Sequence, residues 1–142
     1  MTQNLVAKAT TTVNAPRART WKALVDPSAI KQYMFGTTVT SDWKKGSPIT
    51  WKGEWKGKPY EDKGVILKVE PEKTLQYSHF SPMSGEADKP ENHHTVTIEL
   101  AEAGPETRVS LTQDKNATEK AKEDSEKNWK MMLEGLKKYL EK

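Results

Sequence analysis

The sequence contains no cysteine, and this absence removes disulfides, thiol catalysis and thiolate metal ligands together. It also has no apolar run close to the roughly 18 residues that a membrane-spanning helix needs, so we expect no stable membrane insertion. The opening residues, MTQNLVAKAT, lack a basic segment followed by an apolar one, so no export signal is expected. The sequence therefore predicts a soluble, cytoplasmic protein.

An excess of charge of one sign is also missing. The 142 residues carry 23 lysines and arginines against 20 aspartates and glutamates, which gives a net charge of +3. This balance is too even to indicate a polyanionic partner. A chain of this length builds one core rather than two, so we expect a single domain over residues 1–142.

The stretch WKGEWKGKPYEDKG, residues 51–64, mixes aromatic and basic residues and so raises the question of nucleic-acid binding. Single-stranded nucleic acid needs both kinds of side chain on one accessible surface. In a strand, alternation places Trp51 and Trp55 on one face and Lys52 and Glu54 on the other. The stretch therefore predicts a hairpin with one apolar face, and we expect no nucleic-acid partner.

Helical and strand-like segments follow one another along the chain. Residues 4–13 alternate like a strand, whereas residues 16–26 and 27–34 have helical spacing. From residue 37 the period is two, and strands are predicted at 47–55, 64–71, 74–80, 94–100 and 108–113. Their inward faces are predicted to carry Ile49, Trp51, Trp55, Val65, Leu67, Val69, Leu75, Tyr77, His79, His94, Val96, Ile98, Leu100, Val109, Leu111 and Gln113.

The chain ends in a long amphipathic helix. Asn116 followed by Glu119 three residues later predicts the helix start, because this pair can form a capping box. One stripe of the helix carries the large apolar residues. These are Trp129, Met132, Leu133, Leu136, Tyr139 and Leu140.

This order of elements predicts an α+β fold. One strand precedes two short helices, about six antiparallel strands follow, and the last helix is the element long and apolar enough to cover the sheet. A strongly curved antiparallel sheet wrapped around this C-terminal helix leaves space between the two, which the short helices close at one end. Such a space commonly holds a small molecule.

Several segments together resemble a known family: VNAPRARTWKALVDPSAIKQYMFG, GVILKVEPEKTLQYS, TVTIEL and NWKMMLEGLKKYLE. They are similar to the activator of Hsp90 ATPase homologue 1-like family, which belongs to the START/Bet v 1-like (SRPBCC) superfamily of helix-grip proteins. The resemblance covers roughly residues 8 to 140. It implies the helix-grip fold and a cavity for an apolar or amphipathic ligand. It implies no shared reaction, because fold alone does not determine function.

The expected function is non-enzymatic binding of a small hydrophobic or amphipathic ligand between the sheet and the last helix. Two alternatives stay open: a chaperone- or stress-linked interaction protein with a chaperone partner, and a cyclase- or aromatase-like enzyme that uses cavity histidines and Tyr77. The alternation and the helix stripe turn most of the expected cavity residues inward, and the resemblance places Tyr33 near the cavity mouth. The expected cavity residues are Tyr33, Trp51, Trp55, Tyr77, His79, His94, Trp129 and Met132.

No catalytic residue, cofactor or metal is expected. His93 and His94 are adjacent, so in a regular strand they point to opposite faces and cannot hold one ion together. His79 could approach His94 across the sheet, but two histidines without an inward carboxylate make a weak metal site. The loop over residues 81–94 is left open between a lid that uses Met83 and a surface insertion. The expected state is a monomer or weak homodimer, with Met131 as an exposed apolar contact.

Overall fold

An antiparallel sheet of seven strands curves around the C-terminal helix in the computed structural model. The structure describes residues 5–34, 36–55, 57–81, 93–116 and 118–141, and it describes only the backbone of Trp55. Most of the predicted 81–94 loop, including Met83, lies outside these residues. The elements are β1 (Leu5–Val13), α1 (Arg17–Val25), α2 (Pro27–Tyr33), β2 (Thr38–Ser41), β3 (Pro48–Trp55), β4 (Lys58–Glu70), β5 (Thr74–His79), β6 (His94–Ala103), β7 (Glu106–Asn116) and α3 (Glu119–Leu140).

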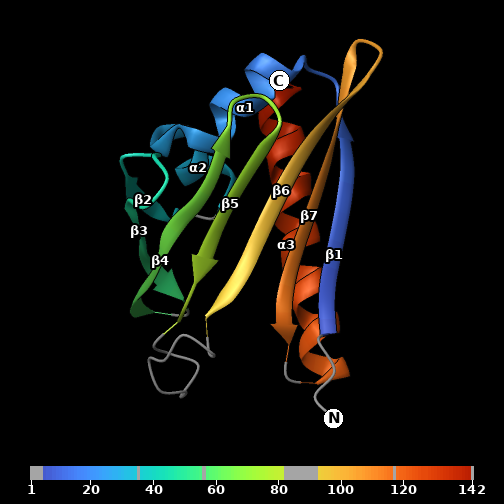
Figure 1. The fold of residues 1–142 in the computed structure, drawn as a ribbon. Helices are drawn as coiled ribbons and strands as arrows, with labels where there is room; N and C mark the ends of the chain where they lie inside the picture. Colours follow the sequence, from blue (N-terminus) through green and yellow to red (C-terminus); the bar gives the residue numbers. More distant parts are fainter. Residues whose placement is uncertain (1–4, 35, 56, 82–92, 117, 142) are drawn as a thin grey trace.

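The strands follow the order β1-β7-β6-β5-β4-β3-β2, so β2 to β7 form a continuous meander and β1 joins it at the far edge. Figure 1 shows α3 crossing behind β6 and β7, with α1 and α2 on the same side of the sheet. This arrangement confirms the predicted α+β helix-grip fold, including the two short helices after the first strand. No helix within the described ranges has the length and apolar character needed to span a membrane.

The apolar stripe of α3 packs against the concave face of the sheet. Leu133 and Leu136 are completely buried, and Leu140 and Met132 are nearly so. Trp129 and Tyr139 are half-buried and pack against the same core. The opposite side of the helix is exposed, as expected for an amphipathic helix with one face on a core.

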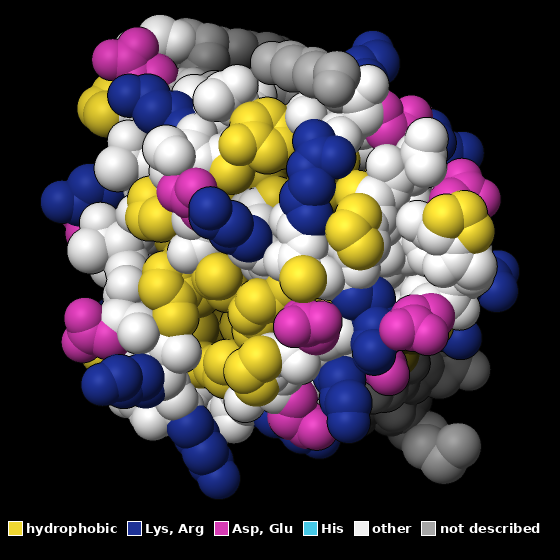
Figure 2. Space-filling view, turned by 90° about the horizontal axis from the view of Figure 1, so that it is seen from above, with side chains coloured by type: hydrophobic (Ala, Val, Ile, Leu, Met, Phe, Trp, Pro, Cys, Tyr) yellow, Lys and Arg dark blue, Asp and Glu magenta, His cyan; other side chains and the backbone are white. Residues whose placement is uncertain are grey.

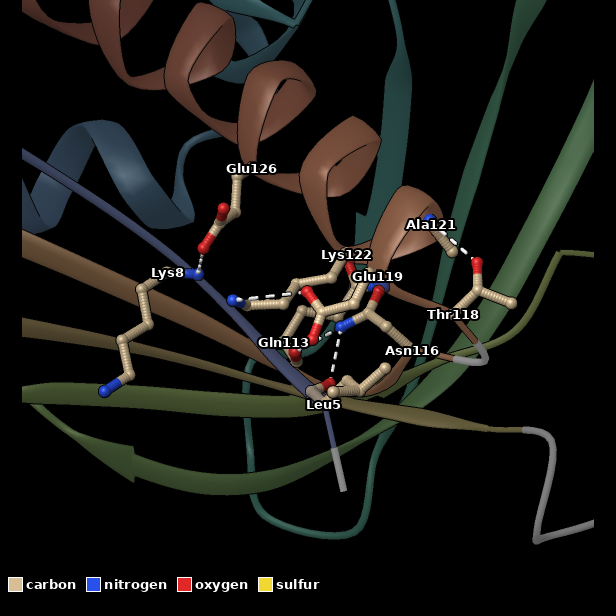
Figure 3. Close-up of polar contacts among 9 residues, drawn as sticks. All are labelled: Leu5, Lys8, Gln113, Asn116, Thr118, Glu119, Ala121, Lys122 and Glu126. Atoms are coloured by element: carbon tan, nitrogen blue, oxygen red, sulfur yellow. Dashed lines mark hydrogen bonds and ion pairs between the residues drawn. The ribbon is translucent and has the colours of Figure 1, made fainter. Parts of the chain in front are cut away.

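The start of α3 differs from the prediction (Figure 3). Thr118 is the N-cap, because its hydroxyl accepts a hydrogen bond from the backbone N–H of Ala121 at 3.0 Å. Asn116 belongs to β7 instead, and its side-chain amide donates to the carbonyl oxygens of Leu5 at 2.8 Å and Gln113 at 3.0 Å. The predicted cap at Asn116 is therefore wrong. Its side chain joins β7 to β1.

Two carboxylates of α3 or its C-cap hold the helix to β1 and to the residue that follows it. Near the start of the helix, Glu126 accepts a hydrogen bond from the backbone N–H of Lys8 at 3.0 Å. Just after its end, Glu141 accepts one from the backbone N–H of Asn14 at 2.8 Å. Lys8 lies in an edge strand, so the helix also satisfies a donor that would otherwise be open to pairing with another chain.

Strand β4 has the opposite inward face from the one predicted over part of its length. Ile66 is buried, whereas Val65 and Leu67 are 41% and 36% exposed. A register shift between Ile66 and Lys68 then returns Val69 to a half-buried position. A β-bulge adds one residue to a strand and so exchanges its two faces. The predicted inward positions of Val65 and Leu67 are wrong for this reason.

At the end of the molecule that carries α1, α2 and the C-terminus, basic and acidic side chains are interspersed (Figure 2). Apolar side chains gather around a shallow hollow in this view. Neither sign of charge dominates the face, which agrees with the even charge balance of the sequence.

Candidate functional site

A cavity of about 480 Å³ lies between α3 and the sheet. Side chains from α3, from strands β4, β5 and β7, and from the segment after α2 converge on it. Segments far apart in the sequence therefore form a single space, as the curved sheet around one helix predicts. Its lining consists of Met34, Thr37, Tyr60, Asp62, His79, Ser81, Gln113, Ser125, Asn128, Trp129, Met131 and Met132.

One wall of the cavity is apolar. Met132 is buried at its base, Trp129 is half-buried, and Met34 packs against the core from the end of α2. Met131 is 57% exposed and also contacts the cavity, which places it at the opening. Methionine side chains adapt to irregular shapes, so this wall suits an apolar body without a fixed outline.

The facing wall is polar. The His79 imidazole Nε2–H donates to Asp62 Oδ2 at 2.9 Å, with both side chains mostly buried. The hydroxyls of Thr37 and Tyr60 are hydrogen-bonded at 2.6 Å. Cavities with one apolar side and a few placed polar groups are typical of small-molecule sites.

A polar pair also joins the two walls at the helix. The indole Nε1–H of Trp129 donates to Gln113 Oε1 at 2.5 Å. This bond fixes the orientation of the Trp129 ring between α3 and β7. The ring therefore presents a defined surface to the cavity.

Several predicted cavity residues lie beneath the cavity instead of lining it. Trp51 is 6% exposed. The centroid of its ring lies 5.0 Å from that of His79, in an edge-on contact, and 5.1 Å from that of Tyr77. Burial raises the pKa of the Tyr77 hydroxyl well above its ordinary value, so this phenol stays protonated. Trp51 and Tyr77 thus form a packed support that holds the His79 ring.

The remaining predicted residues have other positions. Tyr33 is buried in the core, and its hydroxyl donates to the carbonyl oxygen of Ala23 at 3.0 Å. His94 pairs with His79 across β5 and β6, is half-buried, and its Nδ1–H donates to the carbonyl oxygen of Asp114 at 2.8 Å. The side chain of Trp55 lies outside the described part. Of the predicted set, His79, Trp129 and Met132 line the cavity.

The sequence analysis missed Asp62, which faces the cavity from β4. The prediction began this strand at residue 64, whereas β4 begins at Lys58. Tyr60, Asp62 and Gly64 therefore share the inward face with Ile66. Extending the period of two back from Ile66 is the signal that would have placed Asp62 inside.

Specific zinc or iron binding at His79, His93 or His94 is not expected. Within the described ranges, no group of three or more histidine, aspartate or glutamate side chains could hold one ion. Elemental analysis of dialysed protein should give far less than one metal per chain. Stoichiometric metal that disappears in a His94→Ala variant would contradict this prediction.

The chain was compared with protein-family models, and the model of the activator of Hsp90 ATPase homolog 1-like protein matches residues 14–141. The chain belongs to this family. The match spans the cavity and all elements after β1, so the family assignment applies to the part that forms the site. It confirms the resemblance seen in the sequence.

Solved structures give the same fold for this family member. The solution structure of ChR145 from Cytophaga hutchinsonii is 60% identical and matches with a TM-score of 0.84, covering 96% of this chain and 94% of that chain. A comparison with curated protein sequences gives no match.

More distant structures share the fold alone. CalU16 from Micromonospora echinospora is 20% identical, with a TM-score of 0.73 over 99% of this chain and 86% of that chain. The Aha1 dimer from Colwellia psychrerythraea is 19% identical, with a TM-score of 0.73 over 96% of each chain.

Proposed function

We propose that this family member binds a small hydrophobic or amphipathic ligand in the cavity between α3 and the sheet, without catalysing a reaction. The observation that carries the proposal is the cavity of about 480 Å³ with one methionine- and tryptophan-rich wall and one polar wall. Its size falls within the range of about 300–1,000 Å³ typical of ligand pockets. The helix-grip fold, with a helix packed into a curved sheet, supports this proposal.

The arrangement of polar groups favours binding over catalysis. The hydroxyls of Thr37 and Tyr60 are hydrogen-bonded to each other, and the Trp129 indole donates to the side chain of Gln113.

The enzyme alternative would use cavity histidines and Tyr77. Tyr77 is buried below the cavity with a raised pKa, so it is poorly placed to exchange protons with a ligand. Of the two predicted cavity histidines, His94 is bonded to the backbone of Asp114 outside the lining, which leaves His79 with its partner Asp62. The cyclase-like alternative therefore has less support than the carrier.

Interaction through the surface is the second candidate. Val65 and Leu67 are exposed on the outer face of β4, and the family is described by its relation to the Hsp90 ATPase activator. A cytoplasmic chaperone partner would be supported by pull-down of Hsp90 together with increased ATP turnover. The related Colwellia protein forms a dimer, which fits a weak homodimer here. Size-exclusion chromatography over a range of concentrations tests that state.

Titration with the neutral fluorescent probe N-phenyl-1-naphthylamine should give saturable binding at one site. The Met131→Trp variant should bind it about tenfold more weakly, equivalent to about 1.4 kcal/mol, because added bulk at the opening narrows the cavity. Met131 is exposed, so the change leaves the core intact.

Glu134→Trp is the matched control, since it adds the same side chain at an exposed position of the same helix that does not line the cavity. Equal affinities of the two variants would place the probe elsewhere. No saturable binding across a panel of lipids and aromatic compounds would leave the surface-interaction candidate.

A further inference from the structure

The two oxygens of the Asp62 carboxylate have different surroundings. Oδ2 accepts the hydrogen bond from His79 at 2.9 Å. Oδ1 is withdrawn from solvent and has no hydrogen-bond partner within the described part of the chain. The side chain as a whole is only 17% exposed. A buried acceptor without a donor is unfavourable, so this carboxylate has acceptor capacity that the described chain does not use. The exposed part of the side chain lines the cavity, where a ligand can reach the carboxylate.

Neighbouring polar groups do not meet this need. The hydroxyls of Tyr60 and Thr37 are bonded to each other, and Gln113 accepts from Trp129. His79 already donates to Oδ2 of Asp62, and its ring packs edge-on against the Trp51 ring. The Asp62 carboxylate therefore keeps acceptor capacity that these neighbours do not use.

The charged residues that line the cavity also favour a hydrogen-bond donor over an anion. No lysine or arginine is among the described residues that line it, and Asp62 is the carboxylate in that lining. His79 is the group that faces this carboxylate. A second anion brought into the cavity would be repelled by Asp62 at short range, where water screens poorly.

We propose that the cavity selects ligands whose apolar body carries a hydrogen-bond donor, a hydroxyl, amide N–H or ammonium group, and that this donor binds the Asp62 carboxylate. Carboxylates such as fatty-acid anions are selected against. This inference rests on the proposed function, because it names the ligand class for the same cavity. The donor lies at the polar wall while the apolar body packs along Met34, Trp129 and Met132.

Three probes with one aromatic body test the inference: 1-naphthylmethanol, its methyl ether and 1-naphthoate. Binding is measured by isothermal titration calorimetry at fixed pH and salt. The alcohol should bind the native chain at least about tenfold more tightly than the ether, because only the alcohol donates to a charged acceptor. The naphthoate should bind most weakly of the three.

The Asp62→Asn variant keeps the side-chain shape and removes the charge. In this variant the preference for the alcohol over the ether should fall to about twofold or less, because a neutral amide is a weaker acceptor than a carboxylate. Naphthoate binding should improve. Glu61→Gln is the matched control, because it removes a carboxylate from the exposed face of the same strand and should leave all three affinities unchanged. Circular dichroism and thermal unfolding establish that both variants are folded.

Two results would overturn the inference in different ways. Equal binding of the alcohol and the ether to the native chain would refute selection by Asp62, while leaving the cavity as a ligand site. Failure of all three probes to bind would overturn the inference and the proposed function together. The comparison of alcohol with ether in the native chain does not depend on the stability of any variant.

Discussion

Replacing Leu133 with alanine should lower the free energy of unfolding by about 2–5 kcal/mol. Leu133 is completely buried at the centre of the α3 stripe, where the helix meets the concave face of the sheet. The substitution removes apolar surface from the core and leaves a cavity. Closing it would require α3 to shift against β1, to which Glu126 and Lys137 hold it. Urea denaturation followed by far-ultraviolet circular dichroism measures the loss.

Lys130→Ala is the matched control for Leu133→Ala. Lys130 is exposed on the same helix, and alanine is a good helix former, so its change should stay within about 0.5 kcal/mol. A loss as small as this for Leu133→Ala itself would rule out the packing of α3 into the sheet.

Replacing Gly64 with alanine should lower the free energy of unfolding by about 3 kcal/mol or more, which is at the upper end for overpacking. A Cβ at this position would lie 2.7 Å from the carbonyl carbon of Ser78 and closer still to its carbonyl oxygen. Both atoms belong to the backbone of β5, so a whole strand must move to make room. Thermal unfolding of the variant, compared with the native chain, measures the effect.

Gly53→Ala provides the comparison on the neighbouring strand. There the added Cβ would meet the hydroxyl oxygen of Tyr60 at 2.8 Å, which is the end of a side chain. An aromatic side chain can rotate away where a backbone cannot, so this loss should be clearly smaller than that of Gly64→Ala. Equal losses for the two variants would show that the close approach of β4 to β5 does not matter for stability.

The fold was predictable because its main signals are periodic. The strand alternation at β5, β6 and β7, and the stripe of α3, each placed their buried residues on the correct face. The prediction failed in β4 because a bulge between Ile66 and Lys68 changes the face without any change in composition. It failed again at Asn116, where a tertiary contact with Leu5 takes the side chain that local rules assign to a helix cap.

The candidate site was only partly predictable for a different reason. Periodicity shows which way a side chain points, but it does not show whether other side chains fill the space in front of it. His79 and Trp129 both point inward and line the cavity, whereas Tyr77 points inward and is covered by packing. Asp62 was missed because the predicted strand began at residue 64, so the period of two was not extended back to it. A carboxylate is also seldom found on an inward face. Such a residue on an inward face is the clearest departure from the pattern, and it carries the sharpest functional hypothesis.

The position of β1 in the sheet affects how the chain folds during synthesis. β1 is made first, yet its partner is β7: Leu5 pairs with Asn116 and Val13 with Thr107. The meander from β2 to β7 can assemble strand by strand, because each of its members pairs with the next one made. β1 cannot pair until β7 has been synthesised. The β1–β7 pairing joins residues far apart in the sequence, and such pairings are associated with slow folding. The strand that opens the sequence is therefore among the last to join the sheet.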